Sequence, residues 1–208
     1  MKSLFIVFEG IDGSGTSTQA NLLKNYFLNN SIKSIVTSEP SEGPIGNIIR
    51  QGMKQRIFFT NNKRHFDQQM AYLFAADRHD HLYNQIDGVF KKVEEGFQVI
   101  STRYFFSSFA YHCDDEEDLE LVTNLNNKFP NPDIVIYIDN PIEVSLERIS
   151  QRSVQDVYEN KEKLVKVKNN YEEIFSKYSG NLIKVKGNND PMVIHNQIIN
   201  YIEEVYNG

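Results

Sequence analysis

A glycine-rich segment near the start of the chain has the residue types and spacing of a phosphate-binding loop. It reads Gly10-Ile11-Asp12-Gly13-Ser14-Gly15-Thr16-Ser17-Thr18 and stands between an apolar run and a helical pattern. Glycines let the backbone curl so that successive N–H groups point at phosphate oxygens, and a helix start adds its positive dipole end. The hydroxyl of Ser17 stands where such loops bind Mg²⁺. The residues predicted to hold nucleotide phosphates are Gly10, Asp12, Gly13, Ser14, Gly15, Thr16, Ser17 and Thr18.

The loop departs at one position from the usual pattern, G-x-x-x-x-G-K-[ST]. Gly10, Gly15 and Ser17 match it, but Thr16 occupies the place of the lysine that faces the phosphates. Two other interpretations stay open. A glycine-rich turn between a strand and a helix needs no ligand. A dinucleotide site would explain Glu39, which ends the second apolar run where a ribose-binding acid would lie, although the third small residue of G-x-G-x-x-G is missing.

The apolar stripe of a long helix, predicted at residues 65–95, is interrupted by polar side chains. Asp77, Arg78 and His81 fall on a face that is otherwise apolar. Phe74 and Arg78 are four residues apart and therefore lie side by side on a helix. An aromatic plate beside a guanidinium suits a flat heteroaromatic ring that has carbonyl groups at its edge. The alternative is a surface turn on which Asp77 and Arg78 are solvated or ion-paired.

Arg103 stands at the end of another apolar run and precedes a short helix that is rich in hydroxyl groups. Its position, level with the glycine-rich loop, suits a bidentate grip on a second phosphate. Ser107, Ser108 and Tyr111 lie on neighbouring faces of that helix and offer hydroxyl groups to the same region. The aromatic residues in between are predicted to be core, and they are Phe105, Phe106 and Phe109.

Two arginines further along the chain, Arg148 and Arg152, are four residues apart within a polar stretch. Mobile arginines that close over phosphates have this pattern, so we expect a lid over roughly residues 148–163. An ordinary solvated helix face would have the same pattern. The acidic run at residues 114–118 indicates a solvated turn that supplies charge to a helix N-terminus, and the histidines have no metal-ligand spacing with carboxylates.

Five short apolar runs alternate with amphipathic segments along the chain. The runs cover residues 4–8, 34–37, 97–100, 134–138 and 182–185. Continuous hydrophobicity is typical of parallel strands that are buried on both faces. Helices are expected at residues 17–30, 44–55, 65–95, 104–112, 116–128, 141–151, 157–179 and 191–206. The alternation predicts an α/β fold, a three-layer sandwich with a five-stranded parallel sheet, as one domain over residues 1–208.

This topology brings distant residues together. Right-handed crossovers place the carboxyl ends of all strands at one edge of the sheet, where ligands bind. The residues that follow the strands are 9–15, Glu39, Thr102, Arg103 and Asp139. We therefore expect these residues to converge on one site.

The composition limits the kinds of partner and compartment. The chain has 208 residues, 40% of them hydrophobic, and 22 basic against 28 acidic residues give a net charge of −6. This charge argues against a nucleic-acid coat protein, and no apolar run is long enough for a membrane span. The opening apolar stretch is too short for a secretion signal, and the single cysteine, Cys113, fits a reducing compartment. We expect a cytoplasmic protein with neither nucleic-acid nor membrane partners.

Taken together, the motifs resemble those of the thymidylate kinase family over residues 4–178. Phe8-Glu9-Gly10-Ile11-Asp12-Gly13-Ser14-Gly15 is similar to F-E-G-x-D-G-x-G. Thr37-Ser38-Glu39-Pro40, with Gly43-Pro44-Ile45-Gly46, is similar to T-R-E-P-G-G-T-P-I-G. Leu73-Phe74-Ala75-Ala76-Asp77-Arg78 matches L-F-A-A-D-R, and the segment from Arg103 to Tyr111 is similar to D-R-Y-x-x-S-S-x-A-Y. Residues 132–139 resemble the strand motif P-D-x-x-I-Y-L-D.

The resemblance implies an enzyme of the phosphate-loop nucleoside-monophosphate kinase fold. It would transfer the γ-phosphate of ATP to dTMP, giving dTDP for dTTP synthesis, with Mg²⁺ and as a homodimer. Arg103 would hold the acceptor phosphate, and Arg148 and Arg152 would act with it as catalytic groups above the donor phosphates. The residues implied to bind the monophosphate are Asp12, Glu39, Phe74, Arg78, Arg103, Ser107, Ser108 and Tyr111.

The resemblance also implies individual roles within the monophosphate site. Asp12 would bind the 3′-hydroxyl of the sugar, and Tyr111 would crowd its 2′ position and so reject a ribonucleotide. Phe74 would stack on thymine while Arg78 bonds to its edge. Ser107 or Ser108 would help to read the base.

Three positions depart from the family pattern. Thr16 replaces the loop lysine, Ser38 replaces an arginine, and Thr102 replaces an aspartate expected near Mg²⁺. Some members carry an arginine at the position of Gly13, so the lid would have to supply that charge. Losing one preorganised cation costs on the order of a hundredfold in rate. The alternatives to an active dTMP kinase are therefore a nucleotide-binding protein with little turnover, or a kinase of altered monophosphate preference.

Overall fold

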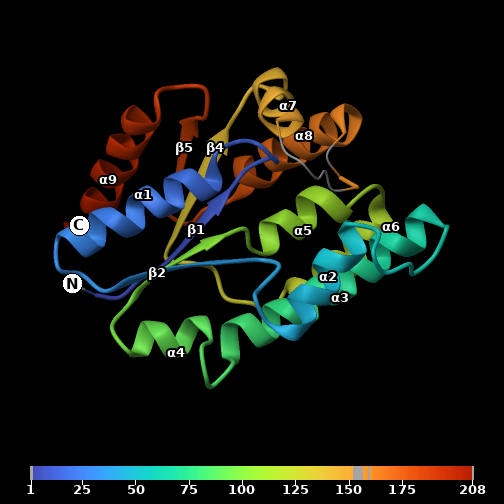
Figure 1. The fold of residues 1–208 in the computed structure, drawn as a ribbon, viewed down its shortest axis with the longest axis horizontal. Helices are drawn as coiled ribbons and strands as arrows, with labels where there is room; N and C mark the ends of the chain where they lie inside the picture. Colours follow the sequence, from blue (N-terminus) through green and yellow to red (C-terminus); the bar gives the residue numbers. More distant parts are fainter. Residues whose placement is uncertain (1, 152–156, 159, 208) are drawn as a thin grey trace.

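The computed structural model describes residues 2–151, 157, 158 and 160–207, and a five-stranded sheet forms its centre. The strands are β1 (Phe5–Glu9), β2 (Ser34–Ser38), β3 (Gln98–Thr102), β4 (Ile134–Asp139) and β5 (Leu182–Lys186). They lie in the order β2-β3-β1-β4-β5, and every neighbouring pair is parallel. β1 is therefore the central strand, flanked at its carboxyl end by the ends of β3 and β4 (Figure 1).

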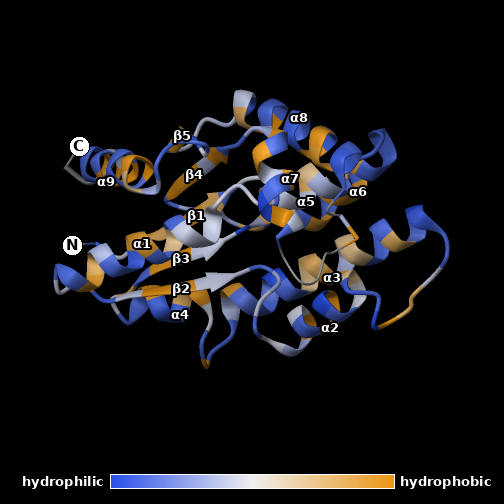
Figure 2. Ribbon diagram, turned by 45° about the horizontal axis from the view of Figure 1, so that its top comes forward, coloured by the Kyte–Doolittle hydropathy of each residue, from blue (hydrophilic) through white to orange (hydrophobic). Residues whose placement is uncertain are grey.

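Helices cover both faces of the sheet (Figure 2). They are α1 (Thr16–Asn29), α2 (Pro44–Met53), α3 (Lys63–Tyr83), α4 (Val89–Glu94), α5 (Phe105–His112), α6 (Glu116–Asn126), α7 (Ile142–Ser150), α8 (Lys161–Lys177) and α9 (Pro191–Asn207). The predicted three-layer α/β sandwich with a five-stranded parallel sheet is confirmed. Within the described part of the chain, no helix combines the length and the apolar character that crossing a membrane requires.

Alternate residues of β1 supply the two halves of the hydrophobic core. Phe5 and Val7 pack with residues of α3, α4, α5, α7 and α8, whereas Ile6 and Phe8 pack with α1 and α9. All of β1 is buried, as is β4 up to Ile138. The continuous hydrophobicity of these two strands therefore reflects burial on both faces, as expected. The edge strands β2 and β5 are only partly buried.

The single helix expected at residues 65–95 is wrong, because α3 and α4 are separate helices. After Tyr83 the chain turns at Asn84, whose side-chain oxygen accepts the N–H of Ile86 at 2.8 Å. Ile86 is 83% exposed, although its place in the apolar pattern indicates burial. Gly88 then starts α4, where a Cβ would lie 2.4 Å from the carbonyl oxygen of Asn84. This turn separates α3 from α4, although the hydrophobic spacing predicts one continuous helix.

The predicted lid is described only in part. Residues 152–156 and 159, Arg152 among them, lie outside the described residues. α8 begins at Lys161, four residues later than expected, because Asn160 caps it by accepting the N–H of Lys163 at 3.0 Å.

Candidate active site

The glycine-rich loop leads from the carboxyl end of β1 into the N-terminus of α1. Gly15 precedes the helix with a φ of +102°, and no described side chain caps the first N–H groups of α1. These groups are left for an anion, which the helix dipole also attracts. Gly13 has a φ of +77°, and a Cβ there would lie 2.6 Å from the carbonyl oxygen of Ser145 in α7. Backbone conformation and close packing thus both require glycine at this position.

A groove of about 490 Å³ runs along the outer surface of the loop. Among the predicted phosphate-binding residues, Asp12, Gly13, Gly15, Thr16, Ser17 and Thr18 line it. Gly10 and Ser14 lie behind the loop instead, and both are buried. Their part in a phosphate site would be to shape the backbone.

The strand ends converge on this groove, as the topology predicts. Glu39, Thr102 and Arg103 line it together with the loop. Asp139 lies apart, because its carboxylate pairs with Lys168 at 2.6 Å and with Lys184 at 3.4 Å. These pairs lower the pKa of Asp139 against the opposing effect of its partial burial.

Arg148 reaches the loop from α7. Its Nη1 donates to the carbonyl oxygens of Gly13 at 3.1 Å and Ser14 at 3.3 Å, and its Nη2 donates to that of Gly187 at 3.2 Å. The guanidinium also lines the groove. A fixed cation therefore stands beside the loop that lacks its lysine, held by backbone carbonyls without a carboxylate in these bonds.

The residues that the resemblance implies for the monophosphate all line one pocket. They are Asp12, Glu39, Phe74, Arg78, Arg103, Ser107, Ser108 and Tyr111. These residues come from the loop after β1, the end of β2, α3, the end of β3 and α5. The ring of Phe74 lies 5.6 Å from that of His112 across the pocket wall.

Arg78 is fully buried, so the interpretation of a surface turn is wrong, although the ion pair that it allowed for is present, with Glu39. Its Nε and Nη2 donate to one Glu39 oxygen at 2.9 and 2.6 Å, and Nη2 also contacts the Ser108 hydroxyl at 3.3 Å. Its Nη1 donates to the side-chain oxygen of Asn126 in α6. Asp77 is also buried, and it accepts the N–H and the hydroxyl of Ser41 at 2.7 and 2.6 Å. The polar face of α3 is thus an organised internal network.

Arg103 and Asp12 join the groove to the pocket, since both residues line both spaces. Arg103 Nη2 lies 2.5 Å from Asp12 Oδ1 and donates to the Tyr111 hydroxyl at 3.2 Å. The Tyr111 hydroxyl also donates to Asp12 Oδ2 at 2.9 Å. Arg103 holds a left-handed backbone with a φ of 76°, a conformation that costs about 1–3 kcal/mol and clusters at functional sites.

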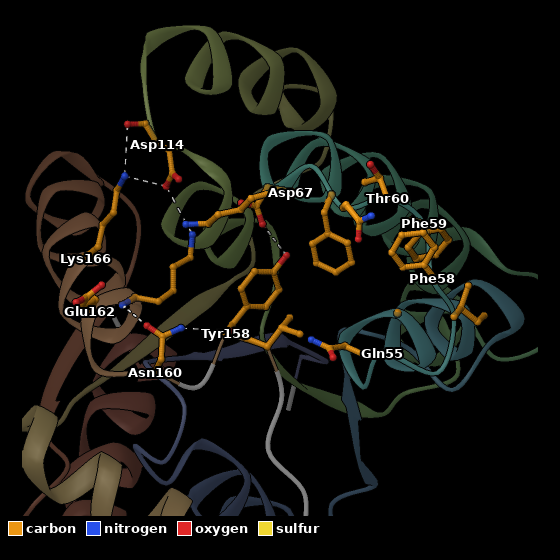
Figure 3. Close-up of a pocket in the computed structure, with 17 residues that line it drawn as sticks. Gln55, Phe58, Phe59, Thr60, Asp67, Asp114, Tyr158, Asn160, Glu162 and Lys166 are labelled. Carbon is orange, nitrogen blue, oxygen red and sulfur yellow. Dashed lines mark hydrogen bonds and ion pairs between the residues drawn. The ribbon is translucent and has the colours of Figure 1, made fainter.

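Tyr158 lines both this pocket and a larger neighbouring cavity of about 720 Å³, which Figure 3 shows. Its hydroxyl donates to Asp67 of α3 at 3.0 Å, and its ring lies edge-on to those of Tyr111 and His112. The pocket itself has a free volume of only about 50 Å³.

Sequence reasoning assigned no role to several residues that line these spaces. Arg50 and Lys54, at the end of α2, line the groove, and Met53 lines both groove and pocket. Arg50 Nη1 donates to the carbonyl oxygens of Pro40 and Ser41 at 3.0 and 2.7 Å. The position of Arg50 in the sequence, shortly after the Glu39-Pro40 motif, could have indicated that it lies near the site. Nothing in the spacing of Tyr158 distinguishes it from other residues of the lid.

A glycine-rich loop after the central strand of a parallel sheet, joined through Asp12 and Arg103 to a second pocket, is the arrangement of the phosphate-loop nucleoside-monophosphate kinase fold. The family model described as thymidylate kinase matches residues 8–198. The chain therefore belongs to the thymidylate kinase family. The predicted type of enzyme, an ATP-dependent dTMP phosphotransferase, is confirmed at the level of this family, and the dinucleotide interpretation is dropped.

Individual relatives agree with this assignment. A protein of Thermococcus kodakarensis described as "Probable thymidylate kinase" is 39% identical over 206 residues, which cover 96% of this chain and 97% of that protein. One of Methanococcus aeolicus with the same description is 36% identical over 200 residues, covering 94% and 93%. The solved structure of thymidylate kinase from Candida albicans is similar with a TM-score of 0.76 and 24% identity, covering 99% of this chain and 93% of that one. This last likeness shows the shared fold.

Proposed function

We propose that this chain binds ATP along the phosphate loop and dTMP in the adjoining pocket, and transfers the γ-phosphoryl group between them. The observation that carries the proposal is that Asp12 and Arg103 line both spaces. An acceptor phosphate held by Arg103 would therefore point toward the donor groove. A dTMP phosphate oxygen then attacks the γ-phosphorus in line, the bond to the bridging oxygen breaks, and ADP leaves.

Phe74 and Arg78 would bind the base. The half-buried ring of Phe74 offers a face for stacking. Arginine has five N–H donors, and Glu39, Ser108 and Asn126 occupy four of those of Arg78 among the described residues. One Nη1 hydrogen is left for a carbonyl oxygen of thymine. Arg78 would thus read the base as a rigidly held donor.

Asp12, Tyr111 and Arg50 would position the sugar and phosphate. A phosphate on Arg103 competes with Asp12 for its guanidinium, which frees the Asp12 carboxylate to accept the 3′-hydroxyl. The Tyr111 ring, 5.0 Å from the Arg103 guanidinium, would crowd the 2′ position. Arg50 would supply a second cation at the acceptor phosphate, because it lines the groove near Arg103.

The donor set fits a magnesium ion that arrives with the nucleotide. The hydroxyls of Ser17 and Thr102 line the groove, and no described group of three or more His, Cys, Asp and Glu residues forms a metal cluster. Mg²⁺ keeps several waters and commonly takes one or two protein oxygens besides the substrate phosphates. Ser17 would hold the ion, which when bound neutralises charge on the transferred phosphates. Thr102 would contribute a neutral oxygen where the family pattern has a carboxylate.

Arg148 would replace the missing loop lysine. Its guanidinium donates to the carbonyl oxygens of Gly13 and Ser14, and Arg148 lines the groove. Three bonds to carbonyls leave its positive charge for the phosphates. Arg152 would act with it from the lid, and residues 148–163 would close over ATP.

We also propose a cytoplasmic homodimer without nucleic-acid or membrane partners. The family resemblance and the net charge of −6 support this assignment. Exposed apolar side chains on α2 and α3, Ile48 at 41% and Tyr72 at 53%, offer a surface for a second copy. Analytical ultracentrifugation tests the oligomeric state.

A nucleotide-binding protein with little turnover is the second candidate, because Thr16 and Thr102 remove charges that the reaction uses. A coupled ADP-release assay with ATP, Mg²⁺ and each nucleoside monophosphate separates the two candidates. The proposed kinase releases ADP fastest with dTMP. Calorimetric binding of dTMP without ADP release would favour the second candidate, and faster turnover of another monophosphate would indicate altered preference.

A further inference from the structure

Glu9, the last residue of β1, is a fully buried carboxylate to which the family resemblance assigns no role. Its Oε1 accepts the backbone N–H of Tyr104 at 2.8 Å. Its Oε2 accepts the hydroxyls of Ser107 in α5 and Tyr171 in α8, both at 2.7 Å. Burying a carboxylate costs free energy, even where three donors bind it. This cost points to a function of Glu9 that involves these three donors.

The same two hydroxyls hold Arg103. Its Nη1 donates to the Ser107 oxygen at 3.1 Å and to the Tyr171 oxygen at 3.4 Å. An arginine can only donate, so each hydroxyl oxygen accepts from Arg103. The two hydroxyl oxygens also lie 2.8 Å apart, so one hydroxyl can donate to the other while the second donates to Glu9. The acceptor-only carboxylate of Glu9 therefore sets the direction of the hydrogen bonds that grip one side of Arg103. Asp12 holds the other side at 2.5 Å.

We propose that Glu9 is a positioning residue that orients Arg103 for the acceptor phosphate through Ser107 and Tyr171. The inference rests on the proposed function of Arg103. Glu9 is behind the loop and absent from the lining of both the groove and the pocket among the described residues, so it acts on the substrate through Arg103. A strained backbone such as that of Arg103, with a φ of 76°, persists only where the surrounding structure holds it, and Glu9 also binds the N–H of the next residue, Tyr104, at 2.8 Å.

Protonation of Glu9 would weaken this arrangement. A protonated carboxyl group must donate to the Ser107 or the Tyr171 oxygen, and it then competes with Arg103 Nη1 for that oxygen. Burial raises the pKa of Glu9 to about 7, against the lowering effects of Arg103, Ser107, Tyr171 and the Tyr104 N–H. The phenols that face it, Tyr171 of α8 and Tyr137 of β4, have raised pKa values and stay neutral. Affinity for dTMP should therefore fall as the pH drops through 7.

The variant Glu9→Gln tests the inference, because its amide keeps the shape and places a donor where an acceptor stood. We expect the KM for dTMP to rise about tenfold or more and the KM for ATP to change less than about threefold. In wild type, kcat/KM for dTMP plotted against pH should fall on the acid side near pH 7, and this fall is the acid limb. In Glu9→Gln it should vanish, leaving only the limb of the dTMP phosphate, whose second pKa is about 6. Glu203→Gln is the matched control, since Glu203 accepts a tyrosine hydroxyl at 2.8 Å on the opposite face of the sheet.

Tyr171→Phe gives a second test that does not change Glu9 itself. Loss of one donor removes a contribution that lowers the Glu9 pKa, so the acid limb should move to higher pH. A merely structural role for Tyr171 would leave the limb where it is. If Glu9→Gln does not fold, this shift alone decides.

An unchanged KM for dTMP and an unchanged acid limb in Glu9→Gln would overturn the inference. Failure of the proposed function has a different result, namely no dTDP from wild-type protein with any donor. In that case calorimetry of dTMP alone at pH 6 and 8 decides the role of Glu9. Titration of the dTMP phosphate weakens binding at pH 6 in both proteins. A weakening that is larger in wild type than in Glu9→Gln supports the role of Glu9, and equal pH dependence in both proteins contradicts it.

Discussion

The Arg103 guanidinium and the Asp12 carboxylate form a 2.5 Å ion pair at the junction of the phosphate groove and the base pocket. Arg103 carries the positive charge that would bind the phosphate of dTMP. Asp12 carries the carboxylate that would accept a hydrogen bond from the sugar hydroxyl. Each therefore has a partner in the free protein that the substrate would replace.

Asp12→Asn should remove discrimination for the 3′-hydroxyl of the sugar. In wild type, 3′-deoxy-dTMP should bind about tenfold more weakly than dTMP, because a hydrogen bond to a carboxylate is lost. In the variant the two ligands should bind nearly alike, and calorimetry of the four combinations measures the coupling. A tenfold preference that persists in Asp12→Asn would move this role to another residue.

Arg78→Ala should weaken dTMP much more than ATP, because Arg78 lines the base pocket and not the phosphate groove. We expect the KM for dTMP to rise at least tenfold and that for ATP to stay within about twofold. The truncation also removes the ion pair of the buried Glu39 and leaves it the contact with His81 at 3.2 Å. Thermal unfolding is therefore measured alongside, and Arg78→Lys is the charge-conserving control. Equal losses for both nucleotides would contradict the assignment.

Arg148→Ala should lower kcat about a hundredfold and leave dTMP affinity nearly unchanged. The expectation follows from its contacts with Gly13 and Ser14 and from its absence among the residues that line the base pocket. Steady-state kinetics with dTMP titrations separate kcat from affinity. If Arg148→Ala, Arg152→Ala and the double variant all turn over as wild type does, another cation replaces the lysine, and Lys54 in the groove is then the residue to change.

Glu9 should make stability depend on pH. Its pKa is raised to about 7 by burial, so protonated Glu9 favours the folded state. This contribution is fully present below the unfolded pKa and is lost as the pH rises through 7, an effect of about 3 kcal/mol. Urea unfolding at pH 5 and 8 should show wild type losing stability relative to Glu9→Gln over this range. Parallel behaviour of the two proteins would mean that Glu9 is charged throughout.

The sequence predicted the sheet, and it predicted residues that the structure places along one pocket, because both depend on local pattern. Continuous apolar runs located β1 and β4, and ordered motifs brought Phe74, Arg78 and Arg103 to one pocket. The predicted parallel topology placed the residues that follow the strands together, because the carboxyl ends of parallel strands lie at one edge of the sheet.

Features that depend on tertiary contacts were missed. Arg78 is held by Asn126 of α6, a partner 48 positions away that no spacing rule indicates. The amphipathic pattern predicted the helix that contains Arg50, but it did not indicate that Arg50 lines the groove. The break between α3 and α4 depends on the turn at Asn84 and Gly88, where local backbone bonding overrides an apolar stripe.

The most direct test follows the γ-phosphate itself. Protein, Mg²⁺, dTMP and ATP labelled at the γ position are incubated, and the nucleotides are separated by chromatography. Label should enter dTDP in an amount equal to the ADP formed. A parallel incubation with UMP in place of dTMP should transfer little label. Label that remains in ATP or appears only as inorganic phosphate, while dTMP binds, would contradict transfer across the Asp12–Arg103 junction.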